Sequence, residues 1–230
     1  MSSWLGPAEW QAVILSVQVA CWATLLSLPF GLFVAYALAR WEFRGKQLLN
    51  ALVHLPLIMP PVVTGYLLLL TLGTQGVIGS ALAKLGIVFA FRWTGAVLAA
   101  AIMAFPLMVR AIRLSIEAVD TGLEEAASTL GASPWAVFFR VTLPLILPGV
   151  IAGGILAFAK AIGEFGATIT FVSNIPGQTQ TIPSAIYAFM QIPDGESAAF
   201  KLVAISIFIA LAAVLVSEWV ALRIARRLEA

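Results

Sequence analysis

A lysine and a glutamate, Lys160 and Glu164, stand four residues apart inside an apolar stretch of the sequence. Residues four apart lie on the same face of a helix, so the two charges are expected to meet. A charged side chain in an apolar helix faces the interior of a bundle or a polar path, because exposing it to lipid is costly. The pair is therefore predicted either to orient neighbouring helices as an internal ion pair or to line a path or its gate.

Four neutral side chains that form hydrogen bonds follow this pair, at Thr168, Thr170, Ser173 and Asn174. A tetrahedral oxyanion needs hydrogen-bond donors, and neutral donors allow its release where strong cationic clamps would trap it. The alternative is that these hydroxyls bond to the backbone of their own helix, as serine and threonine often do in apolar helices. Both roles stay open on the sequence.

Other familiar chemical groupings are missing from the sequence. Gly45-Lys46 lacks the upstream glycine and the following serine or threonine of a nucleotide-binding P-loop. The single cysteine, Cys21, and the single histidine, His54, cannot build a metal cluster or an internal disulfide. No basic arm interleaved with aromatic residues indicates nucleic-acid binding. We therefore expect no catalytic, cofactor or metal site in this chain.

The composition indicates the environment in which these residues act. Hydrophobic residues make up 61% of the 230 residues, charged residues make up 10%, and the mean hydropathy is +1.02. Soluble domains carry about 25% charged residues, and disordered chains carry low hydrophobicity, so both classes are excluded. The sequence is that of an integral membrane protein.

The apolar stretches are long enough for helices that cross a bilayer and too long and continuous for barrel strands. The predicted fold is an all-α bundle of five transmembrane helices that forms a single domain over residues 1–230. Pro56, Pro60 and Pro61 predict that the second span is bent or broken. The apolar segment 181–190 is too short to cross and is expected to be interfacial or re-entrant. The predicted spans are about 12–39, 48–72, 92–110, 145–168 and 202–222.

The basic residues predict the orientation. With five spans, one side of the membrane receives nine lysines and arginines, and the other side receives Lys84, Arg92 and Lys201. Because basic residues accumulate on the cytoplasmic side, the N-terminus is expected outside and the C-terminus in the cytoplasm. The nine are Arg40, Arg44, Lys46, Arg110, Arg113, Arg140, Arg223, Arg226 and Arg227.

The longest cytoplasmic connection, over residues 111–144, has the signals of a helical hairpin. Asp120 can cap a first helix, and Gly131 is suited to end it. Ser133-Pro134 is typical of the start of a second helix. The loop either packs on the bundle as a simple connection or presents its aromatic residues to another protein. The aromatic residues are Trp135, Phe138 and Phe139.

A twenty-residue pattern in this loop resembles the "EAA" motif of permease subunits of ATP-binding-cassette importers. It reads Glu125-Ala126-Ala127, three residues, Gly131, nine residues, Val141, one residue and Leu143-Pro144. Only Val141 departs from the family pattern, which has isoleucine there. The resemblance implies that the loop forms coupling helices that sit in a groove of a cytoplasmic ATPase subunit. The residues it assigns to coupling are Glu124, Glu125, Ala126, Ala127, Gly131, Trp135, Phe138, Leu143 and Pro144.

The segment Gly163-Glu164-Phe165-Gly166-Ala167-Thr168 resembles molybdate and sulfate permeases, and Ile175 to Pro183 is closer to the molybdate branch. The resemblance implies a non-enzymatic inner-membrane subunit that forms a homodimer. Its implied partners are two ATPase subunits, which bind ATP and magnesium, and a periplasmic molybdate-binding protein. The alternatives are a sulfate, thiosulfate or tungstate permease, and an ATP-independent secondary transporter.

Overall fold

The computed structural model describes residues 4–228, and this part of the chain is helical without any strand. The predicted all-α class is therefore confirmed for these residues. Four helices are long and apolar enough to cross a membrane, and a bent pair makes a fifth candidate if its two helices count as one span. The elements are α1 (Pro7–Arg40), α2 (Lys46–Ile58), α3 (Pro61–Leu72), α4 (Gly79–Lys84), α5 (Trp93–Glu117), α6 (Thr121–Thr129), α7 (Pro134–Val137), η1 (Phe138–Thr142), α8 (Leu143–Ile162), α9 (Gly166–Val172), α10 (Ile182–Phe189) and α11 (Glu196–Leu228).

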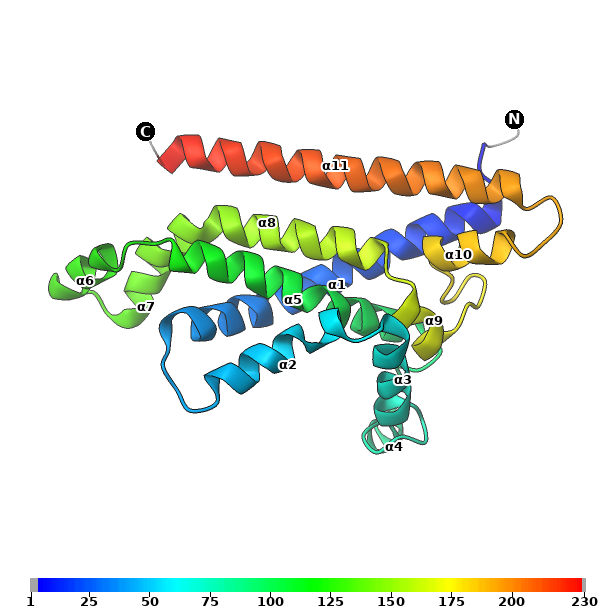
Figure 1. Ribbon diagram of the computed structural model, residues 1–230, viewed down its shortest axis with the longest axis horizontal. Coiled ribbons are helices and arrows are strands. Elements are labelled where there is room, and N and C mark those ends of the chain that lie inside the picture. Colours follow the sequence, from blue (N-terminus) through cyan, green and yellow to red (C-terminus); the bar gives the residue numbers. More distant parts are fainter. Residues whose placement is uncertain (1–3, 229–230) are drawn as a thin grey trace.

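The centre of the bundle is formed by α1, α5 and α8, which run side by side (Figure 1). Helices embedded in lipid gain most from close packing, so small residues collect at their contacts. Buried alanines such as Ala23 of α1 and Ala100 of α5 form this contact on one side of α5. On the other side Gly149 of α8 lies so close to Ser115 that an added Cβ would be 2.2 Å from the serine Cβ. Gly153 of α8 likewise faces α5, since an added Cβ would lie 3.1 Å from the Ile112 side chain.

The second apolar segment is broken, as its prolines predict. Helix α2 ends at Ile58, α3 begins at Pro61, and the two helices are bent by 113°. Proline lacks the backbone N–H that would continue the helix, so Pro60 and Pro61 stop α2 and allow α3 to start afresh. Helix α3 points away from the long axis of the bundle, with α4 at its far end (Figure 1).

The fourth apolar segment, expected as one span over 145–168, is two helices, α8 and α9, separated at Gly163–Phe165. Helix α10 has eight residues, about 12 Å, and is too short to cross a bilayer, as predicted. Its buried Ile182 and Ala185 pack in the same cluster as Ala12 of α1 and Leu202 of α11. Helices α1 and α11 both run from the end near α10 toward the end that carries α6 and α7 (Figure 1).

Candidate functional site

The segment from Asp120 to Leu143 forms a helical hairpin at one end of the molecule (Figure 1). The Asp120 carboxylate accepts a hydrogen bond from the Gly122 backbone N–H at 2.9 Å and caps α6. At the other end of α6, Gly131 has a φ of +88°, where a glycine is favoured. The Gly131 N–H donates to the Ser128 carbonyl, and the N–H of the next residue, Ala132, donates to the Ala127 carbonyl. These two bonds are those of a Schellman motif, so the turn is closed by backbone geometry.

The second arm of the hairpin continues directly into the bundle. Ser133 caps α7 by accepting from the Ala136 N–H at 3.3 Å, and Pro134 opens the helix. Helix α7 passes through the π-helical turn η1 into α8, so that Pro134–Ile162 forms one apolar run of 29 residues. The sequence suggested a hairpin followed by a separate span that begins near residue 145. The structure instead gives one continuous rod, because Leu143 and Pro144 occupy a first turn that η1 leads into without a break.

The hairpin exposes four large apolar side chains, which we call the hairpin patch. Trp135 is 74% exposed and stacks on Phe139 with ring centroids 6.2 Å apart. Phe138 instead turns inward and meets the Tyr36 ring of α1 edge-on at 5.3 Å. An exposed apolar cluster on a hairpin at the end of the molecule is typical of a surface that a partner covers. The hairpin patch consists of Leu123, Leu130, Trp135 and Phe139.

The two adjacent glutamates of α6 point in different directions. Glu125 is exposed together with Ala126, whereas the Glu124 side chain is only 17% exposed. One Glu124 oxygen accepts from the Thr142 hydroxyl at 2.6 Å, and the other lies 3.4 Å from the Arg40 guanidinium. Arg40 also donates to the Val119 carbonyl at 3.1 Å. Glu124 therefore fastens α6 to the end of α1 and to η1.

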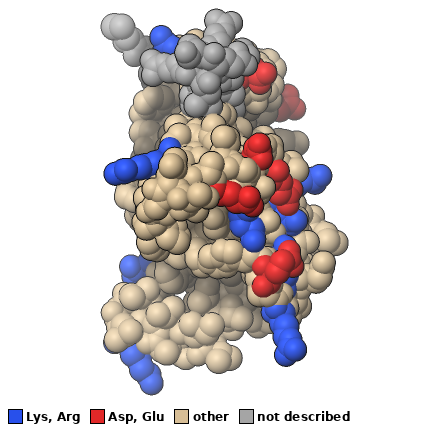
Figure 2. All heavy atoms as spheres, turned by 90° about the vertical axis from the view of Figure 1, so that its left-hand side faces the viewer, with Lys and Arg blue, Asp and Glu red and all other residues tan. Residues whose placement is uncertain are grey.

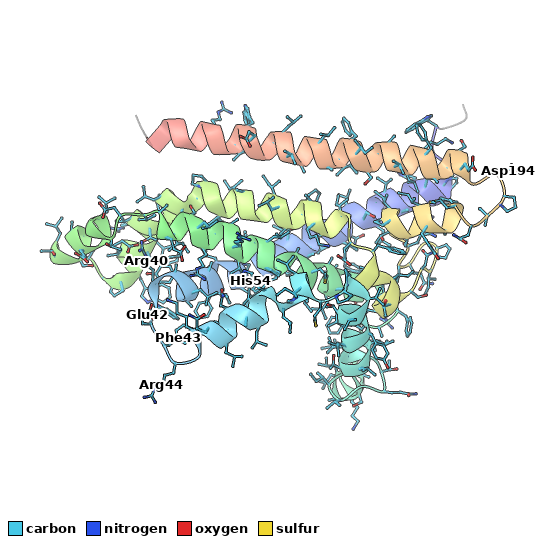
Figure 3. All side chains as sticks on the ribbon, in the orientation of Figure 1. Arg40, Glu42, Phe43, Arg44, His54 and Asp194 are labelled. Atoms are coloured by element: carbon cyan, nitrogen blue, oxygen red, sulfur yellow. The ribbon has the colours of Figure 1, made fainter. Side chains whose placement is uncertain are left out.

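Charged residues gather on this end of the molecule, where acidic side chains lie beside basic ones (Figure 2). Arg40 and Arg44 lie at the hairpin end, whereas Asp194 lies at the opposite end, in the loop before α11 (Figure 3). The role of Arg40 was missed by sequence reasoning, which counted it only as a basic residue of the loop. The one signal in the sequence was the position of Arg40 at the last turn of a predicted span. The acidic helix α6 comes next to it only when the chain folds.

The second candidate region is the break between α8 and α9, where Lys160 and Glu164 do meet. Glu164 is 2% exposed, and its carboxylate accepts from the Lys160 ammonium at 2.5 Å. The other carboxylate oxygen accepts from the Ala167 N–H at 3.0 Å and so satisfies a free donor at the start of α9. The pair spans the helix break rather than sharing one helix, since α8 ends at Ile162. Both acceptor oxygens of the buried charge are therefore used.

The four neutral polar residues beyond the break differ in whether their hydrogen-bond donors are already used. Thr168 donates to Phe165 and Thr170 to Gly166, both within their own helix at 2.9 Å. The Asn174 amide donates to the Ser184 carbonyl at 3.4 Å. Ser173 is exposed, has a φ of +66°, and its hydroxyl has no partner among residues 4–228. Ser173 therefore keeps a free donor, and Asn174 keeps its second amide N–H, while its buried Oδ1 has no partner among the described residues.

Helix α9 crosses α3 at very short range. A Cβ added to Gly65 of α3 would lie 2.5 Å from the Ala167 carbonyl oxygen, and one added to Gly166 would lie 2.7 Å from the Pro61 Cβ. Each helix therefore uses a glycine where it meets the other. Sequence reasoning missed Gly65, whose only signal was a glycine within an apolar helix, which usually has a packing reason.

Within residues 4–228, no three His, Cys, Asp or Glu side chains come close enough to hold a metal ion. The arrangement is thus one of fastened helices, an exposed patch and a buried ion pair, which suits the transmission of movement.

The family model described as "Binding-protein-dependent transport system inner membrane component" matches residues 27–230, and the chain belongs to this family.

Similar proteins of known family are also transport permeases. The chain is 62% identical over 223 residues to the molybdenum transport system permease protein ModB of Escherichia coli (strain K12), covering 96% of this chain and 97% of the relative. The ModB protein of Haemophilus influenzae is 54% identical, with 96% of each chain covered. A probable sulfate transport system permease of Chlorokybus atmophyticus is 36% identical over 79% of this chain and 63% of its own. The resemblance to molybdate permeases is confirmed by these identities.

Solved structures share the fold. A chain of a bacterial alginate ABC transporter, solved in complex with a pentasaccharide-bound periplasmic protein, superposes with a TM-score of 0.71 at 19% identity, covering 97% of this chain and 80% of that one. A chain of an amino acid ABC transporter solved with histidines gives a TM-score of 0.67 at 19% identity and 94% coverage of both chains.

Proposed function

We propose that this chain is the membrane-spanning permease of an ATP-driven molybdate importer of the inner membrane. The observation that carries the proposal is the 62% identity to a molybdenum transport permease along 96% of the chain. The hairpin patch supports the ATP-driven part, because exposed aromatic side chains on a rigid hairpin suit a pocket of a second protein. The chain itself is the non-enzymatic subunit.

The complete transporter contains two copies of this chain, two cytoplasmic ATPase subunits and an external molybdate-binding protein. ATP and magnesium bind to the ATPase subunits. Membrane lipid surrounds the helical bundle. The hairpin of each copy sits in a groove of one ATPase subunit, with Trp135 and Phe139 buried in the contact. The path for the anion lies between the two copies.

In this proposal the chain crosses the membrane five times, with α2 and α3 counted as one bent span. The hairpin faces the cytoplasm, the N-terminus lies outside and the C-terminus is cytoplasmic. Support comes from Arg40 and Arg44, which lie at the hairpin end (Figure 3), since basic residues favour the cytoplasmic side.

Force passes from the hairpin to the outer half of the path along covalent and packed contacts. When ATP draws the ATPase subunits together, the hairpin moves with them and α8 follows, because α7, η1 and α8 are continuous. The Lys160–Glu164 pair keeps α9 attached to α8. The Gly65–Gly166 crossing then moves α3 with α9. We assign the opening and closing of the path to this α3–α9 element.

The anion meets mostly neutral groups in this path. Lys160, whose side chain is 30% exposed, supplies a charge already shared with Glu164, and Ser173 supplies a free hydroxyl. Thr168, Thr170 and Asn174 shape the same region through their bonds to the backbone. A path of this kind binds a dianion weakly, which favours release over trapping.

The test is uptake of labelled molybdate into liposomes that contain this chain, its ATPase and its binding protein. We expect uptake that requires ATP and persists in excess sulfate and thiosulfate, with tungstate as the closest competitor. Equal uptake without ATP or the ATPase would support the secondary-transporter alternative. Preferred uptake of sulfate would assign the chain to the sulfate branch.

A further inference from the structure

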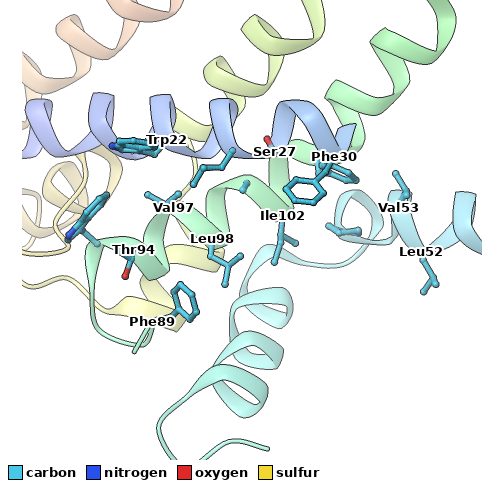
Figure 4. Close-up of a pocket in the computed structure, with 15 residues that line it drawn as sticks. Trp22, Ser27, Phe30, Leu52, Val53, Phe89, Thr94, Val97, Leu98 and Ile102 are labelled. Atoms are coloured by element: carbon cyan, nitrogen blue, oxygen red, sulfur yellow. The ribbon is translucent and has the colours of Figure 1, made fainter. Parts of the chain in front are cut away.

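A groove with a volume of about 800 Å³ opens on the side of the bundle between α1, α2 and α5 (Figure 4). Its walls are almost entirely apolar. Water gains no hydrogen bonds in such a space, so an apolar molecule is the stable occupant. The walls include Trp22 and Phe30 of α1, and Val97, Leu98 and Ile102 of α5.

The groove has the length of one leaflet of a bilayer. Along α5 its lining runs from Trp93 to Phe105. Twelve residues of helix rise by about 18 Å, and half of the hydrocarbon core of a bilayer is about 15 Å. The α2 residues Leu52, Val53 and Pro56 line the groove just before the α2–α3 bend. A groove of this length matches the depth from a membrane surface to about the middle of the bilayer.

The end of the groove that lies away from the hairpin joins a partly polar pocket of about 710 Å³. The two spaces share Phe89, Trp93 and Thr94. The pocket adds Gln18 of α1 and Arg92, which precedes α5. Arg92 is exposed, and its side chain makes no ion pair or hydrogen bond within the described part of the chain. Trp93 lies where the two spaces meet, and tryptophan is typical of the membrane surface.

An apolar channel one leaflet long that ends at an unpaired cation has the layout of a phospholipid. We propose that the groove binds one phospholipid from the leaflet opposite the hairpin, with an acyl chain between α1 and α5 and the phosphate at Arg92. The arginine suits a phosphate because its planar donors match two oxygens at once. The acyl chain fills the space beside the α2–α3 bend, which the protein leaves open. This site is independent of which anion the chain transports.

The proposal is tested on the full-length chain in lipid nanodiscs that contain phosphatidylglycerol with a photoreactive group in the middle of one acyl chain. Cross-links are expected on α5 between Val97 and Ile102, read by peptide mass spectrometry. Arg92→Gln is expected to lower this labelling about tenfold, the loss that corresponds to one charge-assisted hydrogen bond. Lys84→Gln is the matched control, because it removes a basic residue outside the two pockets and leaves labelling unchanged.

A second variant tests the apolar part. Ala101→Trp places an indole in the groove and is expected to abolish labelling, whereas Leu211→Trp on the exposed face of α11 does not. Gel filtration reports whether each variant folds, and the Arg92→Gln result stands on its own if Ala101→Trp does not fold.

Three results would overturn the proposal. One is equal labelling by photoreactive diacylglycerol, which lacks the phosphate. Another is labelling that neither Arg92→Gln nor Ala101→Trp reduces. The third is a disulfide-linked dimer of a Leu98→Cys variant in a Cys21→Ser background, which would show that a second copy of the chain fills the groove.

Discussion

Glu124 in the hairpin and Glu164 at the α8–α9 break each join two helices, but in different surroundings. Glu164 is 2% exposed and pairs with a lysine and a backbone N–H. Glu124 lies at the charged end of the molecule, where its 17% exposed side chain contacts Arg40 and Thr142. A charge in an apolar interior must be fully paired, because nothing else solvates it, whereas water replaces lost partners near a surface. The two carboxylates should therefore respond very differently to the same substitution.

The largest effect is expected at the buried pair. Glu164→Leu leaves the Lys160 ammonium without its partner, and breaking one side of a buried pair costs roughly 3–5 kcal/mol. We expect a large drop in the midpoint of thermal unfolding of the detergent-solubilised protein. The double variant Lys160→Met with Glu164→Gln removes both charges and should recover most of the stability. If the double variant is stable and still transports, the pair acts as a fastener; if it is stable without transport, Lys160 acts on the anion.

The hairpin patch should give the next largest effect, on binding rather than folding. Trp135→Ala removes an exposed aromatic anchor, and such anchors contribute about 2–4 kcal/mol to an interface. The unfolding midpoint should stay unchanged, while co-purification of the ATPase falls at least about thirtyfold. Phe200→Ala is a suitable control, because Phe200 is equally exposed, at 74%, but lies on α11 away from the hairpin. Full ATPase binding by the Trp135 variant would remove the patch from the proposed contact.

The α3–α9 crossing is the third test. Gly65→Val forces a side chain against the Ala167 carbonyl and should cost about 1–3 kcal/mol through displaced backbone. Transport should fall more than stability, because α3 and α9 no longer move together. Gly154→Ala is the matched control, since its added Cβ meets only side-chain atoms at 3.8 Å or more. Unchanged uptake in a folded Gly65→Val variant would show that this crossing does not carry the movement.

A substitution at the turn of the hairpin should cost less stability than one at the α3–α9 crossing. Gly131 has open space around it, so Gly131→Val suffers only from its left-handed backbone, at about 1–2 kcal/mol. We expect ATP hydrolysis that no longer drives uptake, measured as the ratio of ATP hydrolysed to molybdate moved. Gly131→Asn, which accepts this conformation, should keep most of the coupling. Normal coupling in the valine variant would mean that the rigidity of the turn is unimportant.

The smallest effect is expected at Glu124. Glu124→Gln keeps an acceptor for the Thr142 hydroxyl and weakens only the contact with Arg40, so the loss should be roughly 1 kcal/mol or less. Added salt should reduce the difference from the wild type further, as it screens partly exposed charges. A destabilisation as large as that of Glu164→Leu would contradict the distinction between the two carboxylates.

Several features of the fold follow from local sequence alone. The prolines that break the second span, the Asp120 and Ser133 caps and the left-handed Gly131 each act through their own backbone geometry. The helical class follows from apolar stretches that must satisfy their backbone internally in lipid. The contact between Lys160 and Glu164 also needed only their spacing, although the helix break between them was not expected.

Other features depend on which helices become neighbours, and periodicity does not encode this. The sequence contains two adjacent glutamates with the same local signals, and only the arrival of α1 beside α6 turns Glu124 inward and leaves Glu125 exposed. The same holds for Gly65, which matters because α9 lies against it, and for Arg92, which stands beside a groove formed by three separate helices. Backbone geometry and lipid solvation thus determined the helices from the sequence. The packing of distant segments decided which of their side chains fasten the bundle and which remain free to bind.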